Sequence, residues 1–455
     1  MKGNNVDFRS FLSLLQGEGE LVRVKQDVSA EFEVAAVTAK MDGKEAVLFE
    51  KVHGSRIGVA CNVVGTPTRF YLAIVGSRKA SQADIKKAIH ARITEALASL
   101  SAPAKAQGDA PFEKNSSRNL HDLPIVTHFE KDAGPFITSS VVFAKDQEKG
   151  NQNQSTHRLL RLDDRHMAIR IVEGRHLHKC FTYSRDHGED LKVAIAIGVH
   201  PAVSIAAAYQ AAYGVDEMLI ANSLLDGKLA LVKTSYSQLY VPSHAEIVLE
   251  GRILKDRTQE EWMVEMLRTY DFKRKQPVFE LEEIKFRDNA IYHDILPGYA
   301  EHRLLMGLPI EAKMLDYIKN VVPKTQAVHL TDGGSNWLAA VIQIKKRLEG
   351  EPKNALMAAF SAHPALKIAT VVDDDIDPAD PVAVEYAIAT RCQADRDFIM
   401  VPNAKGSSLD PSSDQLNLLT TKVGIDATAS LLKPKERFEI AIIPGEEKIK
   451  LSDYL

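Results

Sequence analysis

Six side chains in the middle of the chain have the types and spacing to form two chemical groups. Successive members are 5, 18, 41, 43 and 5 residues apart, and they are Asn153, Arg158, His176, Glu217, Glu260 and Glu265. An amide oxygen, an imidazole and a carboxylate are ligands that a divalent cation such as Mn²⁺ accepts. A guanidinium with two carboxylates can bind an organic acid and transfer a proton. Together the two groups predict an enzyme with a metal-anchored cofactor and an acid substrate.

The first group is Asn153, His176 and Glu217, and a cation held there would complete its shell with water and a ligand phosphate. Each residue also has an ordinary structural interpretation. Glu217 falls in the first turn of an expected helix, where its charge complements the helix dipole, and His176 could be a hydrogen-bonded structural histidine. The spacing matches no HExxH or CxxC pattern. If this segment is extended, His178 shares a face with His176 and is a possible accessory ligand.

The second group is Arg158, Glu260 and Glu265. The planar guanidinium suits a carboxylate. Residues five apart on a helix are about 140° apart, so the two glutamates would reach one site only from a loop or a strand end. Two neighbouring carboxylates push their pKa values apart, which can make one of them a proton donor near neutral pH. The alternative interpretation is a solvated acidic segment.

Composition narrows the class of protein. The chain has 455 residues, of which 45% are hydrophobic and 26% charged, with a net charge of −4. This length predicts two or three domains. The balanced charge, without a basic run interleaved with aromatic residues, argues against a general nucleic-acid binder. Three scattered cysteines, Cys61, Cys180 and Cys392, fit neither a disulfide framework nor a thiolate zinc site and favour a reducing cytoplasm.

The sequence offers no clear signal for secretion or for a membrane span. The first residues, MKGNNVDFRSFL, contain no apolar core of a secretory signal. The most apolar stretch, Val193–Ala212, contains a histidine and a proline, and it predicts a buried strand followed by a helix opening at Pro201.

The expected fold class is mixed α/β in three parts: an N-terminal α/β domain with its linker over 1–115, a central β-barrel domain over 116–304 and a C-terminal α/β domain over 305–455. The N-terminal part predicts an amphipathic helix at Asp7–Gln16, strands at Glu45–Glu50 and Ile57–Cys61, and a helix at Ser81–Leu100. Residues 101–115 are rich in Ala, Pro, Gly and charged residues, which predicts a linker.

The central part is mostly β. Leu159–Leu162 and Met167–Val172 alternate around Asp163 and Asp164, which predicts a hairpin. The other expected strands are Ile137–Phe143, Val193–Ile197, Leu229–Val232, Leu239–Val241 and Glu246–Leu254. The C-terminal part alternates strand and helix, which predicts parallel strands, over 327–329, 337–348, 355–361, 368–372, 381–392 and 398–401.

Two further motifs are discounted. Asp373–Asp377 resembles a calcium loop but lacks the glycine and the terminal glutamate, so it is expected to end a strand and cap the helix after Pro381. Thr331–Ser335 resembles a phosphate loop but has no GK(S/T), so a turn is expected.

Several stretches in order resemble the UbiD family of reversible decarboxylases. They are Asn153-Gln-Ser-Thr-His-Arg158, LDDRH (162–166), Gly174-Arg175-His176, VKTSYSQLYVPSHAEIVLEG (232–251), YHDILPGYAEH (292–302), VVDDDIDPADPVAVEYAIATR (371–391), GSSLDPS (406–412) and TKVGIDAT (421–428). No single motif is decisive, but their order and spacing are specific, and the resemblance covers residues 45 to 430.

The resemblance implies a UbiD-like architecture, with a split β-barrel that binds prenylated flavin mononucleotide (prFMN), and it implies residue roles. Asn153, His176 and Glu217 would ligate Mn²⁺ (or Mg²⁺) bridging to the prFMN phosphate, with K⁺ nearby. Arg158, Glu260 and Glu265 would be the catalytic set, with Glu260 paired to Arg158 and Glu265 as the proton donor. The implied cofactor-binding residues are Asn153, Ser155, Thr156, His157, Arg158, Arg175, His176 and Glu217.

One departure from the family pattern concerns the acidic segment. The family places a Gly-Pro sequence between its two glutamates, whereas this chain has Glu260-Glu-Trp-Met-Val-Glu265. The loop can therefore differ in shape, with Trp262 or Met263 entering the pocket. Glu261 is an alternative to Glu260 in a register shifted by one residue.

The resemblance is strongest to archaeal members that decarboxylate anhydromevalonate phosphate in a modified mevalonate pathway. The implied partners are a small-molecule acid, a flavin prenyltransferase as cofactor supplier and identical subunits, in a homodimer or homohexamer formed through the C-terminal domain. An aromatic acid substrate and a non-catalytic flavin-binding subunit of a carboxylase assembly are the alternatives. A phosphorylated substrate needs a basic pocket wall, and the hairpin region offers Arg165, Arg170, Arg175 and Lys179, although each could be solvated.

Overall fold

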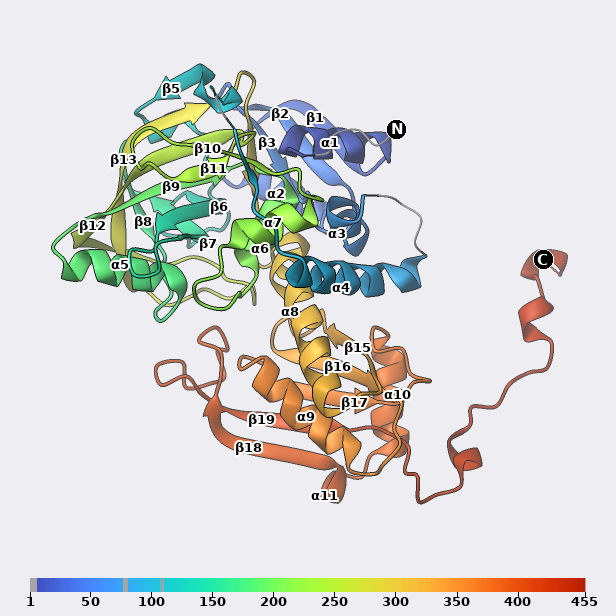
Figure 1. The fold of residues 1–455 in the computed structure, drawn as a ribbon. Helices are drawn as coiled ribbons and strands as arrows, with labels where there is room; N and C mark the ends of the chain where they lie inside the picture. The colour runs from blue at the N-terminus through green and yellow to red at the C-terminus, as the bar shows by residue number, and fades with distance from the viewer. Residues whose placement is uncertain (1–5, 77–80, 107, 109, 455) are drawn as a thin grey trace. The chain divides into compact units, whose positions relative to one another are not determined.

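The computed structural model describes residues 6–76, 81–106, 108 and 110–454. The chain forms two compact units (Figure 1). One comprises Met1–Lys313, Asp332–Trp337 and Leu409–Pro411, and the other comprises Met314–Thr331, Leu338–Ser408 and Ser412–Leu455. The N-terminal and central parts belong to the same unit. The boundaries expected near residues 115 and 304 remain a prediction.

The N-terminal part opens with the expected amphipathic helix, α1 (Phe8–Gly17). Asp7 caps it, accepting a hydrogen bond from the Ser10 amide at 2.8 Å, and its apolar face is buried. The expected strands and helix are β2 (Ala46–Val52), β3 (Gly58–Cys61) and α4 (Gln82–Ala98). Three elements were not predicted: β1 (Leu21–Val28), α2 (Glu33–Lys40) and α3 (Pro67–Ile74).

These strands join β14 (Ile291–Asp294) in a four-stranded sheet of order β1-β2-β3-β14. The expected linker contains β4 (Ala104–Lys105) and a 3₁₀ turn at Pro111–Lys114; its residues 107 and 109 lie outside the described residues. β4 pairs with β10 (Ala230–Lys233), which pairs with β11 (Tyr240–Pro242), so the linker adds a strand to a small second sheet.

The central part is a closed barrel of six strands, which confirms the expected fold class. Its order is β12-β9-β6-β7-β8-β13, and β12 also pairs with β13 to close the ring. The strands are β6 (Phe136–Lys145), β7 (Gln152–Arg161), β8 (His166–Ile169), β9 (Leu191–Ile197), β12 (Ile247–Glu261) and β13 (Arg274–Phe286). The expected hairpin is β7–β8, and β5 (Asn115–Ser117) extends the sheet beside β13.

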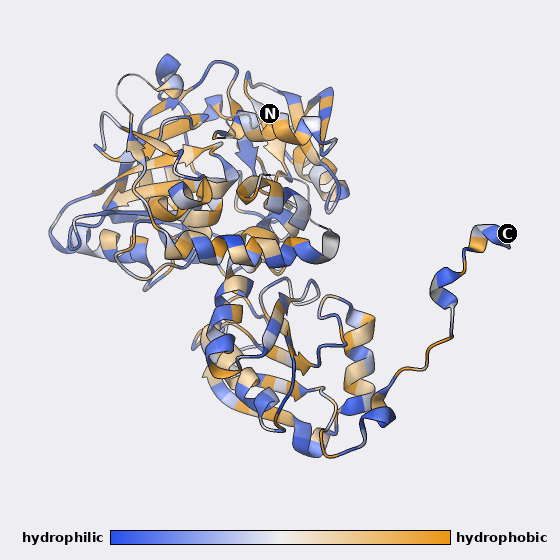
Figure 2. Ribbon diagram, turned by 45° about the vertical axis from the view of Figure 1, so that its right-hand side comes forward, coloured by the Kyte–Doolittle hydropathy of each residue, from blue (hydrophilic) through white to orange (hydrophobic). Residues whose placement is uncertain are grey.

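Side-chain alternation explains which strands lie in the middle of the barrel domain. In β9, Ile195 and Ile197 pack in the same cluster as Leu159 and Met167, whereas Ala194 and Ala196 pack with the helices on the other face. Strands apolar on both faces are buried on both. Figure 2 shows hydrophobic residues running through the barrel strands.

Three helices lie between barrel strands along the chain: α5 (His176–Asp186) follows β8, α6 (Pro201–Ala208) follows β9, and α7 (Glu217–Leu224) follows α6. The strand and helix expected within Val193–Ala212 are confirmed, but α6 ends at Ala208 because Tyr209 adopts an extended backbone (φ −67°, ψ 134°). Among the described residues, no helix is both long and apolar enough to cross a membrane.

The second unit has a five-stranded sheet of order β15-β16-β17-β19-β18. Its three inner strands are parallel, as expected, and its two edge strands are antiparallel to their neighbours. The strands are β15 (Thr325–Leu330), β16 (Ala339–Ile344), β17 (Ile368–Val372), β18 (Phe398–Lys405) and β19 (Leu419–Asp426). The helices are α9 (Glu351–Ala362), α10 (Pro381–Arg391) and α11 (Ala394–Asp397), and α8 (Ala300–Val321) begins in the first unit.

The two discounted motifs have structural roles. Asp373 and Asp375 follow β17 and bind Arg391 at 2.8 and 2.6 Å. The cap of α10 is Asp380, so the capping role expected of residues 373–377 is wrong. Thr331–Ser335 leads into the expected turn.

Candidate active site

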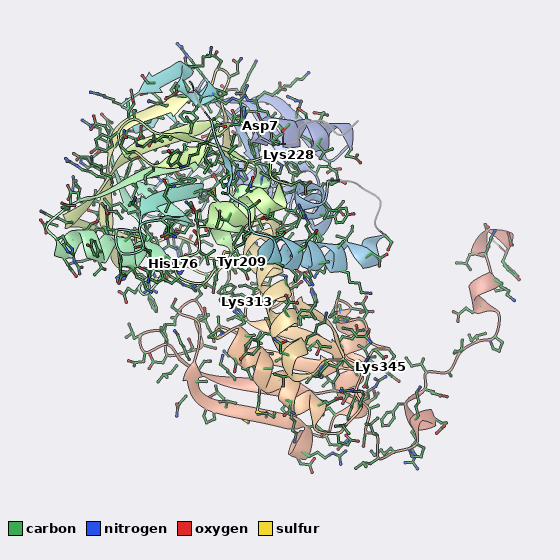
Figure 3. All side chains as sticks on the ribbon, viewed as in Figure 1. Asp7, His176, Tyr209, Lys228, Lys313 and Lys345 are labelled. Carbon is green, nitrogen blue, oxygen red and sulfur yellow. The ribbon has the colours of Figure 1, made fainter. Side chains whose placement is uncertain are left out.

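The predicted cofactor anchor comes together at one end of the barrel domain. Asn153 lies on β7, and His176 and Glu217 are the first residues of α5 and α7. Glu217 joins the three, since one carboxylate oxygen lies 3.4 Å from His176 Nδ1 and the other accepts from Asn153 Nδ2 at 3.4 Å and from the Gln154 amide at 2.9 Å. His176 is labelled in Figure 3.

Two helix N-termini contribute to this site. Unpaired amides and the helix dipole give each N-terminus a partial positive charge that favours an anion. Asp216 caps α7, accepting from the Met218 amide at 2.9 Å. Burial raises the pKa of Asp216 to about 6, and the neighbouring charge of Glu217 adds to the rise.

The donor set fits a divalent cation. Asn153 Oδ1 is buried and has no hydrogen-bond partner among the residues that the structure describes, so it is an oxygen ligand available to a metal. Among the described residues, no three His, Cys, Asp or Glu side chains form a possible metal cluster. The predicted set has only two such side chains, and the amide of Asn153 is its third member.

His178 does not join this group. The segment begins helix α5 at His176 rather than being extended, and residues two apart on a helix point about 200° apart. The premise for an accessory ligand was therefore wrong.

Arg158 binds three carboxylates on the outer face of the barrel. Its Nε and Nη2 donate to the two oxygens of Glu261 at 3.0 and 2.8 Å, and Nη2 also donates to Asp271 at 3.1 Å. Nη1 donates to Glu265. These charges raise the pKa of Arg158 although burial opposes them, so the guanidinium is a permanent cation.

The predicted partner of Arg158 was Glu260, and that choice is wrong. Glu260 is exposed, whereas Glu261 is fully buried at the end of β12. Adjacent residues on a strand point to opposite faces, so only one of the two can face Arg158. Glu265 lies where it was expected, against Arg158.

The acidic loop, which lacks the Gly-Pro of the family pattern, is held by contacts with residues 131–133 and with the barrel. The Val264 amide donates to Asp132 at 3.1 Å, and the Ala133 amide donates to the Trp262 carbonyl at 3.0 Å. The Trp262 indole donates to the Lys131 carbonyl at 2.7 Å, and Met263 packs against the barrel cluster of Phe136, Leu160 and Ala168. Trp262 and Met263 thus anchor the loop that carries Glu265.

A turn at Gly298 supports the other side of this loop. Gly298 has φ +76°, and a Cβ there would lie 2.5 Å from Arg268 Cγ and 3.0 Å from the Glu265 carbonyl. The Gly298 amide donates to His302 Nδ1 at 3.1 Å. Burial lowers the pKa of His302, and the negative charge of Glu265 opposes that fall.

Asp271 and His302 are site residues that the sequence analysis missed. His302 ends the motif YHDILPGYAEH, which carries part of the family resemblance but implies no role for its last residue. Asp271 comes ten residues after Glu261 and had no sequence signal. It reaches the site because its amide pairs with the Met263 carbonyl at 2.9 Å.

The remaining predicted cofactor residues lie on strand β7 and at the start of helix α5. Ser155 and His157 form a chain in which Ser155 Oγ lies 2.8 Å from His157 Nε2, and His157 Nδ1 lies 2.7 Å from the Arg170 carbonyl. Thr156 pairs with Val141 on β6, and Arg175 is the exposed N-cap of α5.

Comparison with known proteins decides the family. Family models of the 3-octaprenyl-4-hydroxybenzoate carboxy-lyase match in chain order: the N-terminal domain over 12–89, the Rift-related domain over 101–300 and the C-terminal domain over 303–427. The chain belongs to the UbiD family. It is accordingly a carboxy-lyase, and the family and activity class expected from the motifs are confirmed.

Relatives and solved structures agree over most of the chain. Anhydromevalonate phosphate decarboxylase from Methanothermobacter thermautotrophicus is 41% identical over 95% of this chain and 98% of the relative. The same enzyme from Methanocaldococcus jannaschii is 48% identical over 72% and 77%. The UbiD-class enzyme HmfF from Pelotomaculum thermopropionicum, solved in complex with FMN, superimposes with a TM-score of 0.93 at 39% identity, covering 99% of this chain and 100% of HmfF.

Proposed function

We propose that this UbiD-family protein is a prFMN-dependent decarboxylase that converts trans-anhydromevalonate 5-phosphate to isopentenyl phosphate in a modified mevalonate pathway. The observation that carries the proposal is the pairing of two sites along strand β7, a metal-type donor set at Asn153 and a carboxylate-bound arginine at Arg158. The names of the archaeal relatives support the choice of substrate.

Asn153, His176 and Glu217 would hold Mn²⁺ or Mg²⁺ and, through it, the cofactor phosphate, with a K⁺ ion nearby. The unpartnered Asn153 Oδ1 and the N-termini of α5 and α7 support this assignment. Structures of HmfF with FMN and with prFMN support the flavin. When bound, prFMN supplies an electron-poor centre that accepts the electron pair left when CO₂ departs.

The protein's own residues then position the acid and move a proton. Arg158, held rigid by Glu261, presents positive charge to the substrate carboxylate. Glu265 delivers a proton to the carbon from which CO₂ has left, and it is returned to the acid form by solvent. Because Trp262, Met263 and Gly298 anchor the loop, Glu265 approaches the site from a fixed direction.

The proposal extends to partners and location. A flavin prenyltransferase would supply the cofactor, identical subunits would assemble into a homodimer or homohexamer through residues 305–455, and the protein would work in the cytoplasm. An aromatic acid substrate, or a non-catalytic flavin-binding role in a carboxylase assembly, is the competing function. The intact contact between Arg158 and Glu265 favours catalysis over the non-catalytic role.

The test is to produce the protein with and without a flavin prenyltransferase and to compare visible absorbance and CO₂ release. Anhydromevalonate phosphate and a panel of aromatic acids are the substrates. We expect CO₂ release only from cofactor-loaded protein and only with the phosphorylated acid. Release from an aromatic acid instead would reassign the substrate, and flavin-loaded protein inactive with every acid would favour the non-catalytic role.

A further inference from the structure

Arg170 lies beside Arg158 on the same face of the barrel. Its amide donates to the Arg158 carbonyl at 3.0 Å. The β7–β8 register pairs Leu159 with Ile169, so the next pair is Arg158 and Arg170. Side chains directly opposite on antiparallel strands share a face, with Cβ atoms about 5 Å apart. The two guanidinium groups therefore rise from one patch of the sheet.

The carboxylates of the site are bound by other arginines. Arg158 forms ion pairs with Glu261, Glu265 and Asp271, and Arg274 forms a second ion pair with Asp271 at 3.0 Å. Among the described residues, the hydrogen bond found for the Arg170 side chain is one from Nη1 to the Ile171 carbonyl at 3.2 Å, and no carboxylate lies within 4.0 Å of it.

A guanidinium without a direct carboxylate contact is unfavourable in this position. Arg170 is half-buried, and burial, together with the charges of Arg274 and Arg158, lowers its pKa, although the more distant charges of Asp271 and Glu261 partly oppose that fall. A partly desolvated cation without a partner costs free energy unless an anion binds it. Within the described part of the chain, the site therefore holds a partly buried cation that makes no hydrogen bond or ion pair with a carboxylate.

The other basic residues of this region point elsewhere. Arg165 donates twice to the Leu281 carbonyl, at 3.1 and 2.6 Å. Lys179 lies over the ring of Tyr213 at 3.7 Å, and Arg175 is exposed. Of the four basic residues noted in the sequence, Arg170 is the one that faces the carboxylate cluster.

Arg158 has little capacity left for a second anion. A guanidinium has five N–H donors, and four of those on Arg158 are used by Glu261, Glu265 and Asp271. The remaining donor, on Nη1, can meet the reacting carboxylate but cannot also bind a dianion. A substrate with a second anionic group needs another cation.

We propose that Arg170 binds the phosphate monoester of the substrate, as a subsite separate from the Arg158 position for the reacting carboxylate. This inference rests on the proposed function, because it requires a phosphorylated acid. The planar fork of arginine suits two phosphate oxygens.

The test compares Arg170→Gln and Arg170→Lys with a matched control, Arg161→Gln, in cofactor-loaded enzyme. Arg161 is also a half-buried arginine whose pKa is lowered by burial, but it is three residues from Arg158 on β7 and points to the opposite face. Each variant is assayed with anhydromevalonate phosphate and with the same acid lacking phosphate. Flavin content and melting temperature establish that each is folded.

We expect Arg170→Gln to raise KM for the phosphorylated acid about tenfold or more, with kcat little changed and KM for the unphosphorylated acid unaffected. Arg170→Lys should recover part of the loss, and inorganic phosphate should inhibit the wild type competitively but Arg170→Gln at least about tenfold more weakly. Arg161→Gln should match the wild type.

Two results would overturn this inference while leaving the proposed function intact. One is an unchanged KM for the phosphorylated acid in Arg170→Gln. The other is an equal rise in KM for both acids, which would mean that Arg170 binds the reacting carboxylate or supports the fold. If the loaded wild type releases CO₂ from an aromatic acid but not from the phosphorylated one, the proposed function fails and the inference fails with it.

Discussion

Arg158 and Glu261 form a bidentate ion pair, in which Nε and Nη2 of Arg158 each donate to one carboxylate oxygen of Glu261, at 3.0 and 2.8 Å. The Glu261 side chain is 0% exposed and that of Arg158 8%. Removing one partner of a buried pair leaves the other charge without compensation, which costs about 3–5 kcal/mol. This pair therefore fixes the orientation from which Arg158 can meet a substrate.

The first prediction separates the two adjacent glutamates. Glu261→Gln keeps the shape of the side chain but removes its charge, so Arg158 loses its orienting partner. We expect kcat/KM to fall by about 100-fold or more. Glu260→Gln is the matched control, because Glu260 is exposed, and it should stay within about twofold of wild type. A large loss in Glu260→Gln with normal Glu261→Gln would reverse the assignment.

The second prediction concerns the proton donor. Glu265→Gln cannot donate a carboxyl proton, so turnover should fall to background while the flavin stays bound, since Glu265 contacts Arg158 rather than the predicted anchor. CO₂ release, proton–deuterium exchange into product and visible absorbance measure the two effects separately. Full activity in this variant would eliminate Glu265 as the acid.

The third prediction concerns the anchor. His176→Ala or Glu217→Ala should lose metal and flavin together, because Glu217 contacts both other members of the set. Metal analysis and absorbance of purified protein provide the measurement. His178→Ala is the control, since this residue lies on α5 but points away from His176. Normal cofactor content in Glu217→Ala would refute the anchor.

The fourth prediction tests the support of the acidic loop. An alanine at Gly298 would place Cβ 2.5 Å from Arg268 Cγ and 3.0 Å from the Glu265 carbonyl. The loop must shift, so we expect kcat to fall about tenfold or more with flavin content unchanged. Gly188→Ala is the control, because Gly188 has nearly the same backbone angle (φ +77°) but a Cβ there would meet no described atom within 4 Å. Equal effects of the two substitutions would mean that backbone strain alone is responsible.

The fifth prediction is a pH dependence of stability. Burial lowers the pKa of His157 from 6.5 to about 4, so the unfolded chain binds a proton at a higher pH than the folded protein does. The free energy of unfolding is therefore highest above pH 6.5 and falls as the pH decreases toward 4, by up to about 3 kcal/mol from this residue. Urea unfolding at a series of pH values measures the slope.

His157→Gln isolates this contribution. Burial also lowers the pKa of His200, to about 3, and the pKa of His302, so the wild-type slope contains all three histidines. The variant should be less stable at pH 7, because the contacts with Ser155 and the Arg170 carbonyl are altered, but its stability should fall less steeply with acid. Parallel curves for the two proteins would exclude His157 as a source of the slope.

Local patterns predicted much of the fold. Period-two alternation and the Asp163–Asp164 turn predicted the β7–β8 hairpin, and Pro201 predicted the start of α6. Strand β13 was missed because Arg274–Phe286 mixes charged and apolar residues in no simple period. It becomes a strand by pairing with both β8 and β12, which are distant in sequence.

The sequence by itself determined the family and most of the elements that hold the predicted site residues. Only the tertiary structure decided that Glu261 rather than Glu260 faces Arg158, and that Asp271, His302 and Arg170 join the site. The physical reason is strand parity: between Ile253 and Thr258, five steps along β12 lie opposite only two steps along β13, from Phe279 to Pro277. The extra residues on β12 change which of its later side chains face outward, so the residue that faces Arg158 cannot be counted from the apolar start of the strand.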